Sequence, residues 1–348
     1  MQTMRAVVYY GKQDVRVERI PVPACGADEL RVQIQACAVC GSDYKTYNNG
    51  NPRMKPPVTM GHEFSGIVES VGANVRGFAA GERIVMATSV SCGKCPYCLR
   101  GWNNLCIDLK PMGFHYPGGM AEYLIIPSTA IKNGHVVKVP PSLEPEYAAL
   151  AEPISCAVNS VENCRITEGN TVVVIGAGPL GIMNLFVAKG FGARKTILAQ
   201  REGKRLEAAK QFDCDLLVNT TKDDLVEIVK AETDALGADC VIVAAPSVQA
   251  QEQAIDLVSK RGRVCLFASL PVGNNMLHLD SRKIHYNELN ILGTSDSTAR
   301  QVTKAIEILQ QPSFPKEKLV THKLPLQQFE EALTIMQSRE GLRVVLTP

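Results

Sequence analysis

The segment Thr171–Ile182, TVVVIGAGPLGI, decides the fold of this 348-residue chain. It opens with a continuous β-branched run over 171–175, which is typical of a strand buried in a parallel sheet. The next six residues match the pattern G-x-G-x-x-G, and a helical pattern follows at 180–189. In this context the glycines let a pyrophosphate approach the backbone at the positive end of a helix. We therefore expect a dinucleotide to bind along this loop, at Gly176, Gly178, Pro179, Leu180 and Gly181.

The residues that follow this segment continue to alternate between strand and helix patterns. Expected strands lie at 196–199, 216–218, 240–244, 264–267 and 289–293. Expected helices lie at 204–211, 224–232 and 251–259. Strands that alternate with helices in this way indicate a parallel, doubly wound α/β sheet, the Rossmann fold. We assign residues 155–296 to this dinucleotide-binding domain.

The first 154 residues carry a different pattern, with many short strands. Leu30, Val32 and Ile34 alternate with polar residues, which predicts a strand with one solvated face. Further short apolar runs lie at 66–68, 83–86 and 123–126, with Gly, Pro and Asn between them. This pattern predicts a β-rich barrel or sandwich over residues 1–154.

The last segment of the chain, 297–348, is too short to form a domain of its own. It contains two expected helices, at 298–309 and 328–337, and one expected strand at 344–346. We expect this segment to return to the β-rich domain and pack on it.

Composition narrows the range of partners. Hydrophobic residues make up 45% and charged residues 21% of the chain, which is ordinary for a globular protein. The formal net charge is +2 and no run of like charges stands out, so neither nucleic acid nor an anionic membrane is an expected partner. No apolar stretch approaches the roughly 20 residues that span a bilayer, and the N-terminal segment turns polar too early for a signal peptide. We expect a cytoplasmic protein.

The end of the second expected strand bears on which dinucleotide binds. An NAD site usually has Asp or Glu there to hold the ribose hydroxyls, whereas this chain has Gln200. Arg201 and Arg205 follow, and such cations suit a 2′-phosphate better than a free hydroxyl. We therefore favour NADP(H) over NAD(H), with Gln200, Arg201 and Arg205 as cofactor-binding residues. Glu202 is the alternative ribose partner if the strand ends two residues later.

Four cysteines are crowded into one short lobe. Cys92, Cys95, Cys98 and Cys106 have the spacing C-x2-C-x2-C-x7-C. Four thiolates this close can surround one Zn²⁺ tetrahedrally and leave no open position, which predicts a structural zinc site. An iron–sulfur cluster is a lesser alternative, because four thiolates can hold either.

A second set of metal-binding side chains is dispersed along the first half of the chain. Cys40 ends an early strand, His62 and Glu63 follow a glycine, and Glu152 lies near the end of the β-rich half. A catalytic zinc takes three protein ligands and keeps one position open for water or substrate. A thiolate, an imidazole and one carboxylate would neutralise the ion and leave that position open.

Together these motifs resemble the zinc-containing medium-chain dehydrogenase/reductase family, and in particular its sorbitol (polyol), galactitol-phosphate and threonine dehydrogenase branch. The resemblance covers nearly the whole chain. It rests on Cys40-Gly-Ser-Asp43, GHEFSGIVESVG at 61–72, the cysteine lobe at 92–106, Glu152-Pro153 and GAGPLG at 176–181, in that order. It implies a GroES-like β-rich catalytic domain ahead of the Rossmann domain, and a homodimer or homotetramer.

The resemblance also assigns roles to individual residues. It implies a catalytic zinc on Cys40 and His62, with Glu152, or a water that Glu152 holds, as the third ligand. Glu63 lies beside the metal and can displace a ligand in some states. Ser42 is placed to take the proton of the alcohol. The residues implied at the nicotinamide end of the cofactor are Phe267, Ser269 and Thr294, and those implied in the substrate pocket are Tyr47, Phe114 and His115.

Three differences within the family refine the expectation. Glu152 stands where alcohol dehydrogenases proper often have Cys, which favours a polyol or sugar-alcohol substrate. Lys45 stands where many relatives have a relay histidine, so the proton leaves through Ser42 and water, or Lys45 binds an anionic group of the substrate. Ser91 stands where the threonine dehydrogenase branch usually has His, which makes that branch the less favoured one.

The sequence thus predicts an enzyme that transfers hydride between a secondary alcohol and NAD(P), with two zinc ions per chain. The expected substrate is a polyol, a sugar alcohol or its phosphate, or the corresponding ketose. Two enzymatic alternatives remain, an NADPH-dependent carbonyl or ketose reductase and an L-threonine dehydrogenase. A catalytically idle relative is a remote third, because no zinc ligand is missing.

Overall fold

The computed structural model describes residues 2–348, which fall into two compact units. The β-rich unit comprises the chain up to Ser155 together with Asp296–Pro348, and the nucleotide unit comprises Cys156–Ser295. The first boundary falls within helix α5 (Ala151–Asn163), and the second follows strand β16 (Asn290–Gly293). Each unit has its own hydrophobic core.

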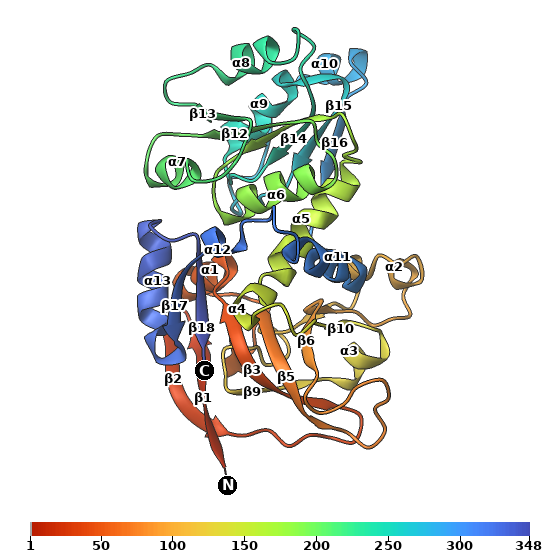
Figure 1. The fold of residues 1–348 in the computed structure, drawn as a ribbon, viewed down its shortest axis with the longest axis vertical. Helices are drawn as coiled ribbons and strands as arrows, with labels where there is room; N and C mark the ends of the chain where they lie inside the picture. Colours follow the sequence, from red (N-terminus) through yellow and green to blue (C-terminus); the bar gives the residue numbers. More distant parts are fainter. Residues whose placement is uncertain (1) are drawn as a thin grey trace. The chain divides into compact units, whose positions relative to one another are not determined.

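The nucleotide unit is built on a six-stranded sheet in which every strand pairing is parallel. The strand order is β13-β12-β11-β14-β15-β16. Besides β16, its strands are β11 (Thr171–Ile175), β12 (Lys195–Gln200), β13 (Leu216–Asn219), β14 (Ala238–Val243) and β15 (Val258–Leu266). Its helices after α5 are α6 (Pro179–Gly190), α7 (Lys204–Ala209), α8 (Leu225–Ala231), α9 (Val248–Gln253) and α10 (Ser281–Tyr286). Helices α6 and α7 cover one face of the sheet and α8, α9 and α10 the other (Figure 1).

The buried strand that the sequence predicted at 171–175 lies in the middle of this sheet. Strand β11 is buried along its whole length, as its β-branched composition requires, and it pairs with β12 on one side and β14 on the other. The strand order therefore reverses at β11, and in doubly wound sheets a ligand binds at the carboxyl end of the strands at this point. The glycine loop follows β11 directly. The Rossmann prediction is confirmed.

One predicted element of this unit is wrong. A helix was expected over 251–259, but α9 ends at Gln253, a short 3-10 turn covers Ala254–Asp256, and β15 already begins at Val258. Three of the four residues at 255–258 are apolar, and the segment fits either pattern. The segment becomes a strand because β15 pairs with β14. This pairing gives its backbone N–H and C=O groups the hydrogen bonds that they would otherwise make in a longer helix.

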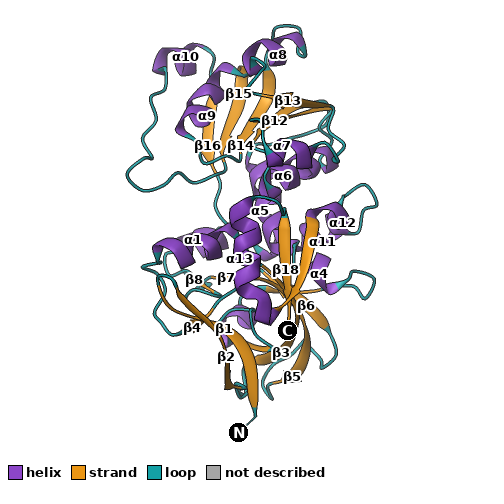
Figure 2. Ribbon diagram, turned by 90° about the vertical axis from the view of Figure 1, so that its left-hand side faces the viewer, coloured by secondary structure: helices purple, strands orange, loops and turns teal. Residues whose placement is uncertain are grey.

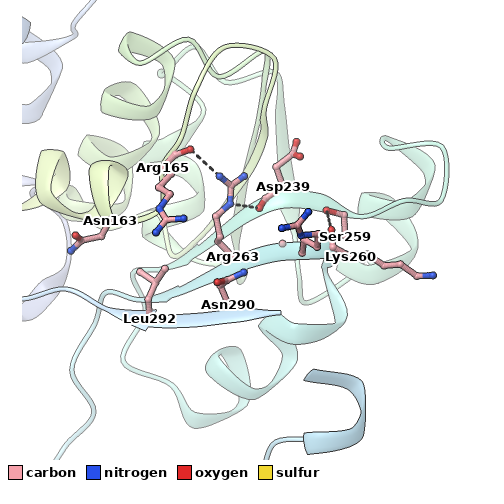
Figure 3. Close-up of a pocket in the computed structure, with 10 residues that line it drawn as sticks. Asn163, Arg165, Asp239, Ser259, Lys260, Arg263, Asn290 and Leu292 are labelled. Carbon is pink, nitrogen blue, oxygen red and sulfur yellow. Dashed lines mark hydrogen bonds between the residues drawn. The ribbon is translucent and has the colours of Figure 1, made fainter. Parts of the chain in front are cut away.

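A cavity of about 450 Å³ opens on the nucleotide unit at the amino ends of β14 and β15. Arg263 lies in it and donates hydrogen bonds to the backbone carbonyls of Asp239 (3.1 Å) and Arg165 (2.8 Å), as Figure 3 shows. These hydrogen bonds attach the segment after α5 to the sheet, so Arg263 has a structural role. The cavity lies at the opposite strand ends from Gly176, so it is distinct from the dinucleotide loop.

The described residues of the β-rich unit, from 2 onward, form three sheets. The largest has the order β10-β6-β5-β3-β18-β17, with β9 paired to β3 as well, and two smaller sheets have the orders β2-β1-β4 and β7-β8. The strands are β1 (Thr3–Gly11), β2 (Asp14–Pro21), β3 (Leu30–Ala38), β4 (Val58–Thr59), β5 (Glu63–Val71), β6 (Arg83–Met86), β7 (Ser89–Val90), β8 (Lys110–Pro111), β9 (Tyr123–Ile126), β10 (Val136–Lys138), β17 (Val320–Pro325) and β18 (Arg343–Thr347). Figure 2 shows these strands curving around one another in orange.

The helices of this unit are short except near the carboxyl end. They are α1 (Gly41–Asn49), α2 (Pro96–Leu99), α3 (Ser128–Lys132), α4 (Pro145–Ala148), α11 (Ala299–Leu309), α12 (Lys316–Leu319) and α13 (Phe329–Ser338). Strand β18, the last of the chain, pairs antiparallel with β3, and β5 pairs with β3 on its other side. Ala38 near the end of β3 is therefore flanked by Glu63 of β5 and Val345 of β18. Within residues 2–348, no helix is both long enough and apolar enough to cross a membrane.

Candidate catalytic and cofactor sites

Cys40 lies at the junction between β3 and α1. Its backbone N–H donates to Oδ2 of Asp43 at 2.9 Å, so this carboxylate caps the first turn of the helix and fixes the position of the cysteine. The side chain of Asp43 is only 3% exposed, and it also lies 3.7 Å from Nδ1 of His62. Asp43 was quoted in the sequence motif but not predicted as a site residue. The sequence feature that could have identified Asp43 is an acidic residue three positions after Cys40, the N-cap of helix α1.

His62 and Glu63 reach the same place from β5. The register of the sheet sets Glu63 opposite Ala38, two residues before Cys40. The ligand atoms of Cys40, His62 and Glu63 all lie within 4.8 Å of one another. Gly61 makes this approach possible, because its φ is 95° and a Cβ there would lie 2.6 Å from Cγ of Met120.

The chemistry of this cluster fits a zinc ion. A thiol, an imidazole and a carboxyl are the donors that Zn²⁺ takes in catalytic sites. His62 is buried; its Nδ1 lies 3.7 Å from the carboxylate of Asp43, and its Nε2 lies 3.3 Å from Oγ of Ser42. Burial raises the pKa of the Cys40 thiol, and the carboxylate of Asp43 raises it further. A cation is the partner that would stabilise the thiolate here.

Glu152 lies close to this cluster but outside it. It is in the first turn of α5, and its charge contributes to the raised pKa of Cys40. The set of ligand atoms within 4.8 Å contains Glu63 and not Glu152. The structure thus brings Cys40, His62 and Glu63 together and leaves Glu152 as a nearby charge.

Arg343 is a residue of this region that the sequence reasoning missed. It begins β18, is 4% exposed, and forms an ion pair with Glu63, whose side chain is 1% exposed. Burial lowers the pKa of the Arg343 guanidinium, while Cys40 and Asp43 act in the opposite direction. The signal in the sequence was a single arginine that begins an otherwise apolar strand.

The other predicted site residues of the β-rich unit lie near the cluster, against the hydrophobic core or on the surface. Oγ of Ser42 is 3.3 Å from Nε2 of His62, and the ring of Phe114 is 5.2 Å from the imidazole. Lys45 and His115 are exposed, and Tyr47 packs against the hydrophobic core.

The four lobe cysteines come together as predicted from their spacing. Their sulfur atoms all lie within 4.8 Å of one another, with 3.4 Å between Cys95 and Cys98. A hydrogen bond from the backbone of Cys98 lowers the pKa of Cys95 to about 6, which favours the thiolate that a metal requires. The backbone N–H groups of Cys92 and Asp108 donate to the sulfur of Cys106 at 3.2 and 3.3 Å. The donor set fits a closed zinc site.

The glycine loop has the close packing that its motif predicts. A Cβ on Gly181 would lie 1.8 Å from the carbonyl oxygen of Gly176, so only glycine fits where α6 meets β11. Gly178 is the N-cap of α6, and Pro179 is the first residue of that helix. A Cβ on Gly178 would lie 3.2 Å from a guanidinium nitrogen of Arg205, so this cation lies beside the loop.

Of the residues predicted to bind the ribose, one contacts the glycine loop and the others lie on the surface. Oε1 of Gln200 accepts a hydrogen bond from the backbone of Ala177 at 2.9 Å, which ties the end of β12 to the loop. Arg201 is exposed. Glu202, the alternative partner, forms an ion pair with Lys222 at 2.9 Å.

The residues predicted at the nicotinamide end follow the carboxyl ends of two neighbouring strands. Phe267 and Ser269 come after β15, and Thr294 comes after β16. Oγ of Ser269 bonds the carbonyl of Leu270 at 3.3 Å. Oγ1 of Thr294 is buried without a hydrogen-bond partner in the described part of the chain, so a cofactor would supply one.

Two family models match the chain, one within each of its two halves. Residues 26–141 match the family described as alcohol dehydrogenase GroES-like domain, and residues 179–311 match the family described as zinc-binding dehydrogenase. The chain is 32% identical to sorbitol dehydrogenase of Halalkalibacterium halodurans, over 99% of both chains. It is 33% identical to L-threonine 3-dehydrogenase of Bacillus subtilis, over 94% of both.

A solved structure is similar over the whole length. A zinc-binding dehydrogenase from Sinorhizobium meliloti bound to NADP superposes with a TM-score of 0.91 at 28% identity and covers 100% of both chains. The chain therefore belongs to the zinc-containing medium-chain alcohol dehydrogenase family. Within that family it is a zinc-dependent NAD(P) dehydrogenase of the polyol and threonine dehydrogenase group.

Proposed function

We propose that this enzyme oxidises the secondary hydroxyl of a polyol, a sugar alcohol or a sugar-alcohol phosphate, with NADP as the preferred acceptor. The observation that carries the proposal is the convergence of Cys40, His62 and Glu63 within 4.8 Å at the ends of β3 and β5. Glu152 beside them and the similarity to sorbitol dehydrogenase support a polyol. The substrate is a small molecule, and a homodimer or homotetramer in the cytoplasm is the expected form.

The residues of the site divide the chemical work between them. A zinc ion bound there would supply a Lewis acid for an alcohol oxygen, and a bound nicotinamide dinucleotide would supply a hydride acceptor. Cys40 and His62 would hold the ion, and Glu63 or Glu152 would supply the carboxylate. Ser42, whose hydroxyl is 3.3 Å from the imidazole, takes the proton of the alcohol and passes it to water.

The preference for NADP rests on the charges at the end of β12. Arg205 lies beside Gly178, and Arg201 lies on the surface next to Gln200. Glu202, which would favour a free ribose hydroxyl, is already paired with Lys222. The relative from Sinorhizobium meliloti was solved with NADP, which supports the same preference.

The proposal is tested on the purified full-length protein. Metal analysis should find two zinc ions per chain, and a panel of polyols and sugar-alcohol phosphates should show zinc-dependent turnover. Replacing Cys40→Ser should abolish turnover while dinucleotide binding, measured by fluorescence, stays unchanged. Cys25→Ser is the matched control, because Cys25 is a free thiol that belongs to neither cluster. Full activity of the Cys40→Ser protein would refute the assignment.

The cofactor preference has a separate test. We expect Arg205→Ala to weaken NADP binding by about tenfold, the order of one lost charged hydrogen bond, and to leave NAD binding nearly unchanged. Lys210→Ala is the control, because Lys210 lies one and a half turns further along and pairs with Glu207 on the surface. Equal loss of both dinucleotides would contradict the preference.

A further inference from the structure

The cavity at the amino ends of β14 and β15 has no part in the function proposed above. Its volume of about 450 Å³ is in the range of sites that bind small molecules. All the residues that line it belong to the nucleotide unit. The glycine loop follows the carboxyl end of β11, so the cavity and the predicted dinucleotide site lie at opposite ends of the same sheet.

The walls of this cavity are strongly cationic. The ionisable side chains that line it are four cations and one carboxylate, namely Arg165, Lys260, Arg261, Arg263 and Asp239. The carboxylate of Asp239 accepts a hydrogen bond from the backbone N–H of Thr171 at 2.8 Å, so it is engaged on β11. Arg261 forms an exposed ion pair with Glu288 at 3.3 Å, and Lys260 extends away from the other side chains in Figure 3. The two remaining cations, Arg165 and Arg263, carry the argument.

The guanidinium of Arg263 is fixed in place, but no carboxylate neutralises its charge. It donates to the backbone carbonyls of Asp239 and Arg165, and to Oδ1 of Asn170 at 3.3 Å. All three acceptors are uncharged. A guanidinium has five N–H donors, so two of them are left for a further partner. Besides its structural role, Arg263 therefore presents a positioned positive charge at the cavity wall.

Arg165 adds a second guanidinium to the same cavity, and Figure 3 shows it near Arg263. Its backbone carbonyl accepts the hydrogen bond from Arg263 at 2.8 Å, whereas its side chain forms no hydrogen bond or ion pair with the described residues 2–348. Its φ is 50°, in the left-handed region that favours glycine or asparagine. Such strained residues concentrate at binding sites, where the side chain has a use that offsets the strain.

Two neighbouring guanidinium groups select the kind of ligand. They repel each other unless an anion lies between them, and their planar N–H pairs match the oxygens of a phosphate group. The cavity is much larger than a bare phosphate, which leaves room for an organic part beside Asn290 and Leu292. Its walls contain neither histidine nor cysteine, and Oγ of Ser259 bonds the carbonyl of Lys260 at 3.5 Å. The arrangement suits binding rather than catalysis.

We propose that this cavity binds the phosphate group of a small phosphorylated metabolite, held by Arg165 and Arg263. The bound molecule is a ligand that stabilises the nucleotide unit, because it connects the segment after α5 to β15, and it is not consumed. This second site is independent of the function proposed above and would stand if that function were wrong.

The test is isothermal titration calorimetry on the full-length, zinc-loaded protein, with NADPH at saturation so that the dinucleotide loop is occupied. The probes are inorganic phosphate, adenosine monophosphate and glucose 6-phosphate. We expect wild type to bind them, and Arg165→Gln to bind them at least about tenfold more weakly, the order of one lost charged hydrogen bond. Arg165→Lys keeps the charge but loses the planar fork, so its affinity should lie in between. Arg194→Gln, at an exposed arginine of the same unit outside the cavity, is the matched control and should bind like wild type.

Thermal unfolding gives a second readout. Saturating ligand should raise the Tm of wild type and Arg194→Gln, and leave that of Arg165→Gln unchanged. Equal affinities for the three probes would support recognition of the phosphate alone, and tighter binding of the nucleotide or the sugar phosphate would identify the source. Absence of binding by wild type for all three probes, or equal affinity of wild type and a folded Arg165→Gln protein, would overturn the proposal.

Discussion

The buried ion pair between Glu63 and Arg343 makes the sharpest stability prediction. The two side chains are 1% and 4% exposed, and they connect β5 and β18 across the end of β3. In the zinc-free protein, replacing Arg343→Met leaves the Glu63 carboxylate buried without its cation, and breaking such a pair costs about 3–5 kcal/mol. For a unit of roughly 200 residues this lowers Tm by roughly 6–20 °C. Glu63→Gln together with Arg343→Met should recover part of the loss, because the Glu63 charge is then removed while buried Asp43 still lacks the guanidinium.

The assay is thermal unfolding followed by circular dichroism, with the four proteins of the double-mutant cycle measured side by side. A partly exposed ion pair between the neighbouring strands β3 and β5 is the control. Arg31 and Glu69 meet at 2.7 Å with side chains 25% and 38% exposed, and Arg31→Met should cost no more than about 1 kcal/mol. If Arg343→Met changes Tm no more than Arg31→Met does, the reasoning from burial is refuted.

Three further predictions follow from the structure. Gly181→Ala should weaken dinucleotide binding at least about tenfold, because the added Cβ would lie 1.8 Å from the carbonyl oxygen of Gly176. Gly11→Ala should leave dinucleotide binding unchanged, because no atom lies within 4 Å of a Cβ there. Equal affinities of the two variants in a fluorescence titration would contradict the prediction. Cys98→Ser should halve the zinc content and destabilise the lobe, seen as faster proteolysis there; unchanged zinc stoichiometry would refute a four-thiolate site. Burial lowers the pKa of His135, so the stability that the neutral imidazole contributes is complete above about pH 6.5 and is lost as the pH falls. His135→Gln should therefore flatten the fall in Tm below that pH. An equal fall in Tm in the wild type and the variant would count against this prediction.

Much of the fold could be read from local patterns. The β-branched run before Gly176 and the glycine spacing require a strand, a tight turn and a helix in succession, and no distant residue is needed to specify them. The four lobe cysteines are equally local, because fifteen residues of chain cannot separate them widely. Where the local pattern was ambiguous, as at 255–258, strand pairing with β14 decided and the predicted helix was wrong.

The sequence by itself determined the two-part α/β architecture, the glycine loop, the lobe and the residue types of a zinc site, because each is encoded by spacing over a few residues. Only the tertiary structure placed Glu63 rather than Glu152 among the converging ligand atoms and paired Glu63 with Arg343. These groups are separated by up to 280 residues of chain. Sheet register and burial bring them together, and no spacing within a short segment records either.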